Sequence, residues 1–426
     1  MKKIIRPQTI GKITFLALFS VASLGQLPAQ AKNTVVVALF DGFAPNLVDT
    51  IETPHFDEIR ETGSWSHHLV PEFPSISLTN HTSFLTGCHP ENHGILSNRF
   101  IDPQKGHYDH FADADWRTGC TTLFEAAEDN GLKAAALYIA SRYSSKDGPR
   151  ASIINEEKHY KDFPDDFGRS EHALNLLRKS TEERPDLIVV YFQGPDGSQH
   201  FKGIETPETV SDVKRSDQIV GHLKNALATL GNGDTGSLII GTDHGMIPIK
   251  GIVNIDRILR RHSIDAKVAS AGTSSFLYLN DTTDRDAALS ALSGYDAFKA
   301  YAKGDFPAYA RIGTSDRAPD ILLAAKPPYF IEDSDLFPNF AHWMGITRIW
   351  PDVFTPPITV LHATHGYDPS IPEMHGIFYA WGHGIKQGHT VETLKVIDIH
   401  PTVAALMGFP AGEPIDGSPA TEILTR

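Results

Sequence analysis

Three continuous apolar runs, each followed closely by an aspartate, most constrain how this chain can fold. They are residues 34–40, 187–192 and 237–241. Runs of this kind, rich in valine, isoleucine and leucine, are typical of strands that are buried on both faces of a parallel sheet. Ligands of such sheets bind outside the carboxyl ends of the strands. Asp41, Asp196 and Asp243 follow the three runs at these positions.

Helical patterns alternate with the apolar runs. We expect helices at residues 121–130, 171–179, 208–230 and 401–407, and further strands at residues 134–139 and 376–381. Strands that alternate with helices predict an α/β fold with a doubly wound, mostly parallel sheet and helices on both of its faces.

The chain of 426 residues is long enough for one large α/β domain with an insertion. Residues 247–363 differ from the rest, because they contain several prolines and a stretch rich in tryptophan and phenylalanine. We predict that they form an inserted α+β cap subdomain. The α/β core would then consist of residues 32–246 and 364–426.

Residues 1–31 have the pattern of a signal peptide. A basic segment precedes a short apolar stretch at residues 13–24, and Ala29-Gln30-Ala31 matches a cleavage site. We expect export to the periplasm or the cell exterior and no membrane span after cleavage; an uncleaved anchor is the alternative. The net charge of −14 argues against nucleic acid as a stable partner, because a nucleic-acid backbone attracts basic proteins.

The chain contains two cysteines, Cys88 and Cys120. An exported protein with an even number of cysteines can form a disulfide. Two free, buried thiols are the alternative.

A short stretch from Phe73 to His81 contains a serine at the start of an expected helix. The helix covers residues 78–85 and is ended by Gly87. A serine there lies among free backbone N–H groups, at the positive end of the helix dipole. Ser77 is therefore either a capping residue or a nucleophile beside an anion site.

A set of aspartates and histidines could bind metal. Asp196 and His200 are four residues apart, a spacing that places two ligands on one face of a helical turn. The other members are Asp41, Asp243, His244 and His365. Oxygen and nitrogen ligands without thiolates suit zinc with positions open for a substrate.

These motifs together resemble the alkaline phosphatase superfamily, and most of all its nucleotide pyrophosphatase/phosphodiesterase branch. The resemblance runs from residue 35 to about residue 410. The motifs that carry it are Asp41-Gly42-Phe43, Phe73-Pro74 with Ser77 and Asn80-His81, Thr86-Gly87 with His93-Gly94, Pro195-Asp196 with His200, Thr242-Asp243-His244-Gly245, and His365-Gly366.

The resemblance implies two zinc ions, which bind a small phosphate-ester substrate between them. Asp196, His200 and His365 would hold one ion, and Asp41, Asp243 and His244 would hold the other. Ser77 would be the nucleophile beside the second ion and would form a covalent phospho-serine, because a metal lets a hydroxyl attack near neutral pH. Asn98 corresponds to the amide that helps to bind a phosphoryl oxygen.

The sequence departs from this branch in two places. The nucleophile is usually threonine, and here it is Ser77, with Ser75 and Thr79 close by. Leu78 stands where nucleotide-cleaving members often have an aromatic residue that stacks on the base. Five further histidines are expected to support the ligands or to lie at the surface, not to bind metal; they are His81, His89, His93, His375 and His383, of which His375 is expected to pack.

Three alternatives are open. A phosphomonoesterase needs extra donors, in some members a lysine and an arginine two residues apart. Residues 140–150 offer Arg142, Lys146 and Arg150 without that spacing, so we predict a preference for diesters with an apolar substituent against Leu78. A sulfatase is disfavoured, because its motif has a proline two residues after the nucleophile. A binding protein without turnover would leave the Ser77 hydroxyl idle.

Overall fold

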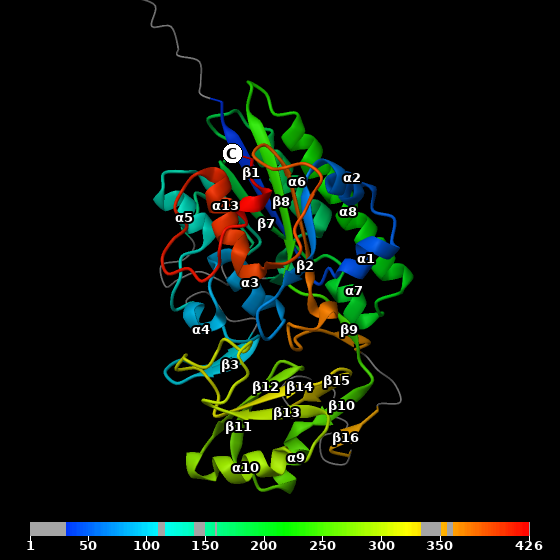
Figure 1. Cartoon of the computed structure of the whole chain (residues 1–426), viewed down its shortest axis with the longest axis vertical. Helices are drawn as coiled ribbons and strands as arrows, with labels where there is room; N and C mark the ends of the chain where they lie inside the picture. The colour runs from blue at the N-terminus through cyan, green and yellow to red at the C-terminus, as the bar shows by residue number, and fades with distance from the viewer. Residues whose placement is uncertain are drawn as a thin grey trace, which may run out of the picture. The chain divides into compact units, whose positions relative to one another are not determined.

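A large, mostly parallel β-sheet runs through the molecule (Figure 1). The computed structural model describes residues 31–109, 116–139, 150–157, 160–333, 351–355 and 361–425. Within these ranges the sheet consists of nine strands: β1 (Asn33–Phe40), β2 (Ser64–Val70), β5 (Ala134–Leu137), β6 (Ile153–Ile154), β7 (Leu187–Phe192), β8 (Thr235–Thr242), β18 (Gly376–Gly382), β19 (His389–Thr390) and β20 (Leu394–Lys395).

Strand β1 lies in the middle of this sheet. It pairs in parallel with β7 and with β8, so that Leu39 lies opposite Tyr191 and Phe40 lies opposite Thr242. Residues 35–40 are fully buried, as expected for an apolar strand between two layers of helices. Strand β18 pairs antiparallel with both β8 and β2. The predicted mostly parallel α/β sheet is confirmed.

Helices cover both faces of the sheet. One group of contacting helices comprises α2 (Pro54–Thr62), α6 (Asp166–Leu177) and α8 (Pro207–Ala228). The other comprises α3 (Ser77–Thr86), α5 (Leu123–Asp129) and α13 (Ile399–Met407), and Figure 1 shows the two groups on opposite sides of the strands. The remaining helices of this region are α1 (Pro45–Thr50), α4 (Pro90–His93) and α7 (Asp196–Phe201).

Helix α6 begins five residues earlier than the sequence pattern predicts. Asp165 caps the helix, because its side chain accepts a hydrogen bond from Gly168 N at 2.9 Å. The first turn contains buried polar residues instead of an apolar stripe, so the helical period is not visible there.

The predicted α+β insertion forms smaller sheets. One contains β10 (Gly251–Asn254), β15 (Tyr329–Glu332) and β16 (Val353–Phe354); the other contains β11 (Ala266–Ser270), β12 (Ser274–Leu279), β13 (Phe298–Ala302) and β14 (Ile321–Ala325). Helices α9 (Ile255–Arg261) and α10 (Arg285–Leu292) pack with them around a separate hydrophobic core. The bounds of 247 and 363 stay a prediction.

Two short sheets complete the described structure. Strands β3 (Arg99–Asp102) and β4 (Gly106–Asp109) form a hairpin, and β9 (Ile247–Pro248) pairs with β17 (Ala363–Thr364) next to the predicted bounds of the insertion. The buried Arg317 of the insertion donates to Asp102 of the hairpin and to Gly94 O, both at 2.6 Å.

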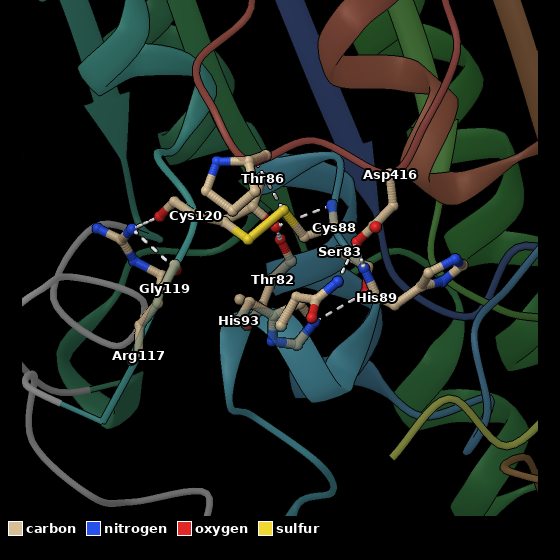
Figure 2. Close-up of a disulfide and its surroundings, with 12 residues drawn as sticks. Thr82, Ser83, Thr86, Cys88, His89, His93, Arg117, Gly119, Cys120 and Asp416 are labelled. Carbon is tan, nitrogen blue, oxygen red and sulfur yellow. Dashed lines mark hydrogen bonds between the residues drawn. A yellow bond between two sulfur atoms is a disulfide. The ribbon is translucent and has the colours of Figure 1, made fainter. Parts of the chain in front are cut away.

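Cys88 and Cys120 form a disulfide just beyond the end of α3 (Figure 2). Next to it, Arg117 donates to Cys120 O and to the carboxylate of Glu125, which is the N3 residue of α5. The disulfide therefore joins the end of α3 to the segment that leads into α5.

The predicted signal peptide lies outside the described residues, apart from Ala31. Among the residues that the structure describes, none of the helices is long and apolar enough to cross a membrane.

Candidate active site

The ends of the central strands bring the predicted ligands together. Asp41 follows β1, Asp243 and His244 follow β8, and Asp196 begins α7 after β7. Since the carboxyl ends of parallel strands meet at one edge of a sheet, residues that are far apart in sequence become neighbours there. Their ligand atoms form two groups, and the atoms within each group lie within 4.8 Å of one another.

The first group, which we call the buried group, consists of Asp41, Asp243 and His244. All three residues are buried. His244 Nε2 lies 3.4 Å from Asp41 Oδ1 and 3.3 Å from Asp243 Oδ2. Gly42 N donates to Asp243 Oδ1 at 3.0 Å, so one carboxylate oxygen is held by the backbone while the other faces the group.

The second group, which we call the open group, consists of Asp196, His200 and His365. Asp196 and His200 are partly exposed, whereas His365 is buried. The Nε2 atoms of His200 and His365 lie 3.3 Å and 3.6 Å from Asp196 Oδ1. The rings of His365 and His244 stack with their centroids 3.5 Å apart, so the two groups adjoin.

The three histidines are oriented in the same way. Each Nδ1 atom faces a backbone carbonyl: His200 at 2.7 Å from Ala363 O, His244 at 3.0 Å from Gly245 O, and His365 at 3.0 Å from Ser75 O. A neutral imidazole that donates from Nδ1 has a lone pair on Nε2. Each Nε2 lone pair then points toward carboxylate oxygens of its own group.

The buried carboxyls and imidazoles of the site shift one another's pKa values. Burial raises the pKa of Asp41 well above its usual range, and the charges of Asp243 and Asp196 raise it further. Burial lowers the pKa of His244, and it lowers the pKa of His365 well below its usual range. His244 and His365 are therefore neutral, and their Nε2 lone pairs face carboxyl oxygens. For His200, the effect of burial is outweighed by the charge of Asp196, which raises the pKa of His200. A divalent cation between them would turn these contacts into ligand bonds.

Ser77 lies beside the buried group. It is the first residue of α3, whose N-cap is Ile76 and has no side-chain cap. The capping alternative for Ser77 is therefore wrong. Ser77 Oγ lies 3.4 Å from Asp41 Oδ1 and 3.2 Å from His244 Nε2.

The two neighbouring hydroxyl residues are buried, unlike Ser77. Ser75 Oγ donates to Tyr367 O at 2.9 Å, and Thr79 is fully buried. The geometry therefore separates Ser77 from Ser75 and Thr79, which the sequence motif alone did not do decisively.

Asn98 lies at the start of α3. Its Oδ1 atom accepts a hydrogen bond from Leu78 N at 3.1 Å, which places the side-chain amide next to Ser77. Asn80 holds the turn before Ser77, because its side chain donates to Pro74 O and Ile76 O at 3.0 Å. The backbone around the hydroxyl is thus fixed on both sides.

The prediction that an apolar part of the substrate lies against Leu78 is wrong. Leu78 is 3% exposed and belongs to the main hydrophobic core. Consecutive residues of a helix are rotated by about 100°, so the residue after Ser77 points into the core instead of toward the ligand groups.

His81 is the histidine whose place at the site the sequence reasoning missed. His81 Nε2 lies 2.8 Å from Asp243 Oδ2, and the residue is 2% exposed. Its position four residues after Ser77 on the same helix face was the available signal. His93 and His375 lie elsewhere, near Ser83 Oγ at 2.9 Å and His68 Nδ1 at 3.2 Å.

Residues 140–150, the candidate donors for a monoester, lie mostly outside the described residues. Arg142 and Lys146 lie outside the described residues. Arg150 pairs with Asp129 at the surface, with Nη1 and Oδ1 2.6 Å apart.

A separate cavity of about 720 Å³ lies between the last turns of α6 and α8. These turns lead into β7 and β8, so the cavity lies at the edge where the parallel strands begin. It therefore belongs to the opposite end of the sheet from the two ligand groups.

Comparison with known proteins defines the class. The sequence model of the family "Type I phosphodiesterase / nucleotide pyrophosphatase" matches residues 35–368. The chain therefore belongs to this family, which confirms the branch of the alkaline phosphatase superfamily that the motifs indicated. It is a hydrolase of phosphodiester or pyrophosphate bonds.

Individual relatives have low sequence identity, but the matches cover most of both chains. Ectonucleotide pyrophosphatase/phosphodiesterase family member 7 of Rattus norvegicus is 23% identical over 406 residues, which cover 93% of this chain and 88% of the relative. Human bis(5′-adenosyl)-triphosphatase ENPP4 is 25% identical over 385 residues, 88% of this chain and 78% of the relative. The structure of murine ectonucleotide pyrophosphatase/phosphodiesterase 5 has a TM-score of 0.78 at 21% identity and covers 92% of this chain and 100% of its own.

Proposed function

We propose that the protein is an exported, zinc-dependent enzyme that hydrolyses small phosphodiesters or pyrophosphates through a covalent phospho-serine on Ser77. The observation that carries the proposal is the place of Ser77 Oγ, 3.2 Å from His244 Nε2 at the edge of the buried group. This hydroxyl adjoins the buried group, and the two groups together offer six oxygen and nitrogen ligands, the composition of a two-metal site.

The residues divide the work between them. The buried group and the open group would each hold one zinc ion, and bound zinc would lower the pKa of the serine hydroxyl and stabilise negative charge on the phosphoryl oxygens. Ser77 Oγ gives its proton to solvent and attacks phosphorus. An Oγ–P bond forms, and the leaving oxygen departs with the electron pair of its bond and takes up a proton from solvent. Water then attacks the same phosphorus, the Oγ–P bond breaks, and Ser77 Oγ takes up the proton that the water releases. The Asn98 amide would bind a phosphoryl oxygen during both steps.

Relatives suggest the class of substrate. One is named for hydrolysis of a bis(5′-adenosyl) triphosphate, and an inactive variant of another was solved in complex with AMP. A nucleotide pyrophosphate or diester would fit this chain as well. Since Leu78 is buried, it offers no platform for a base, and recognition of the leaving group would depend on other residues.

Two features support export. The first 31 residues have the pattern of a signal peptide. Cys88 and Cys120 form a disulfide, and disulfides persist in oxidising compartments.

A hydrolysis panel combined with metal analysis tests the proposal. Purified protein should contain about two zinc ions per chain, lose activity on exhaustive chelation and regain it with zinc. The nitrophenyl ester of a nucleoside 5′-phosphate should have a higher kcat/KM than nitrophenyl phosphate. Full activity without metal would reject the metal assignment. A clear preference for nitrophenyl phosphate would instead favour the phosphomonoesterase alternative.

A further inference from the structure

The two carboxylate oxygens of Asp41 have different neighbours. Oδ1 faces the site, 3.4 Å from both Ser77 Oγ and His244 Nε2. Oδ2 accepts a hydrogen bond from the Tyr191 hydroxyl at 2.7 Å and lies 3.6 Å from His81 Nε2. The tyrosine is the nearer of these two partners, and its hydrogen bond leaves Oδ1 facing Ser77 and His244.

Tyr191 is itself held firmly. It is 6% exposed and lies on β7, opposite Leu39 of β1. The guanidinium carbon of Arg169 lies 5.2 Å from the centre of its ring, and Arg169 Nη1 donates to Tyr191 O at 3.3 Å. A cation over an aromatic face is an attractive contact, and it is stronger where water is excluded. Arg169 is 1% exposed.

The same turn of α6 supports the chain that leads to the open group. Asp166, three residues before Arg169, accepts hydrogen bonds from Gln193 N at 2.8 Å and Gly194 N at 3.0 Å. These residues connect β7 to Asp196. The first turn of α6 is thus linked to both ligand groups. Arg169 contacts Tyr191, which bonds to Asp41 of the buried group, and Asp166 holds the backbone that leads to Asp196 of the open group.

We propose that Tyr191 is a positioning residue, which orients Asp41 for metal binding in the buried group and is backed by Arg169. The proposal rests on the proposed zinc dependence. Partners that hydrogen-bond to a metal ligand fix its orientation, and their loss typically lowers metal affinity by about 10–100-fold. Without the hydroxyl, Oδ2 of Asp41 would lose its donor at 2.7 Å and keep only the more distant His81 Nε2, at 3.6 Å, so the carboxylate could rotate away from the site.

The test compares two tyrosine-to-phenylalanine variants. Tyr138 is the matched control, because its ring also faces Arg169, at 5.5 Å, while its hydroxyl lies 3.0 Å from His172 Nδ1. Each change removes one hydroxyl beside the same arginine, but only Tyr191→Phe touches Asp41. Both are made in a His200→Ala background, where the buried group is the remaining complete ligand set, and also in the otherwise unchanged chain.

The measurement is the zinc dissociation constant, obtained by competition with a chromogenic chelator. In the His200→Ala background, Tyr191→Phe should weaken zinc binding by about 10–100-fold, while Tyr138→Phe leaves it unchanged. In the otherwise unchanged chain, Tyr191→Phe should lower activity at limiting zinc, and excess zinc should restore part of it.

Three outcomes would overturn the proposal. Equal zinc affinity in the two variants would show that the hydroxyl does not position Asp41. Equal weakening by Tyr138→Phe would show that the effect comes through Arg169 packing alone. A drop in the Tm of the zinc-free Tyr191→Phe protein that is as large as the loss of zinc binding requires, with no such drop in Tyr138→Phe, would show that Tyr191 acts through the fold. Absence of zinc binding by the unchanged chain would instead reject the proposed function.

Discussion

The two ends of helix α3 differ in what surrounds them. At its start, Ser77 lies beside the buried group, which adjoins the open group, and part of the open group is exposed to solvent. At its end, Gly87 adopts a left-handed conformation with φ of 68°, and the disulfide follows at Cys88 (Figure 2). The start of α3 therefore carries the proposed nucleophile. The other end, at Gly87 and Cys88, is bonded to distant parts of the chain, and we call it the closed end.

Contacts at the closed end come from distant parts of the sequence. Asp416 N and Gly417 N both donate to Gly87 O at 2.9 Å, and His89 N donates to Asp416 Oδ2 at 2.8 Å. On the helix itself, Ser83 Oγ lies 2.9 Å from His93 Nε2. A nucleophile must be held within a fraction of an ångström of its productive position, and rigid support at one end of its helix allows openness at the other. Changes at the start should therefore affect activity, and changes at the end should affect stability.

The largest expected effect is at the start of the helix. Ser77→Ala removes the proposed nucleophile and little volume, so turnover should fall by several orders of magnitude while zinc stays bound. The free energy of unfolding should change little, because Ser77 caps no helix. Activity assays, metal analysis and urea unfolding on the same preparation measure the three quantities.

Ser75→Ala and Thr79→Ala are the matched controls for Ser77→Ala. Both residues are fully buried and Ser75 Oγ donates to Tyr367 O, so these variants should keep most of the activity and lose some stability. Near-normal turnover in Ser77→Ala, together with loss in either control, would place the nucleophile at another residue of the stretch.

The sequence allowed the central sheet and its reactive edge to be predicted. Buried parallel strands have continuous apolar sequences, and the polar residues that follow them lie together at the carboxyl-end edge of the sheet. Asp41, Asp243 and His244 were recognisable because each directly follows such a run.

The supports of the site were harder to predict. Tyr191 lies inside an apolar run, so the sequence predicts it as a strand residue. Nothing in the sequence indicates that its hydroxyl bonds to Asp41, 150 positions away. Leu78 was misassigned, because the motif fixes its place in sequence but not the face of α3 on which it lies. The contact between Gly87 and Asp416 joins segments that share no pattern, and the two cysteines left pairing and free thiols equally open.

The disulfide should have the next largest effect, and on stability. It closes a loop with a sequence separation of 32 residues. Loop-closure entropy gives roughly 3–4 kcal/mol of stabilisation for such a loop. The double variant Cys88→Ser, Cys120→Ser should therefore lose about that much unfolding free energy in urea, while kcat/KM under conditions where it stays folded changes only a few-fold.

A thiol titration under denaturing conditions is the control for the disulfide variant. Unchanged protein purified from an oxidising compartment should show no free thiol. Two results for the double cysteine variant would contradict the different roles of the two ends of α3. One is an unfolding free energy equal to that of the unchanged protein, and the other is a loss of activity as large as that of Ser77→Ala.

The smallest expected effect comes from a buried histidine next to the closed end. His400 is fully buried in α13, which packs against α3. Burial lowers the pKa of His400 from 6.5 to about 4. Because the folded-state pKa is lowered, the unfolded chain binds a proton between these values that the folded chain does not, and stability falls as pH falls through this window.

Between pH 7 and pH 4.5, His400 should therefore cost the protein roughly 2–3 kcal/mol of unfolding free energy. His400→Gln stays neutral at both pH values, so its loss over the same interval should be smaller by that amount, whatever its stability at pH 7. Urea unfolding of both proteins at the two pH values measures the difference, in which the contributions of the carboxylates cancel. Turnover at neutral pH should be nearly the same in both, because His400 lies toward the closed end of α3. An equal pH-dependent loss in the two proteins would mean that His400 does not titrate in this window, and a large loss of turnover would mean that the closed end of α3 also contributes directly to the chemistry.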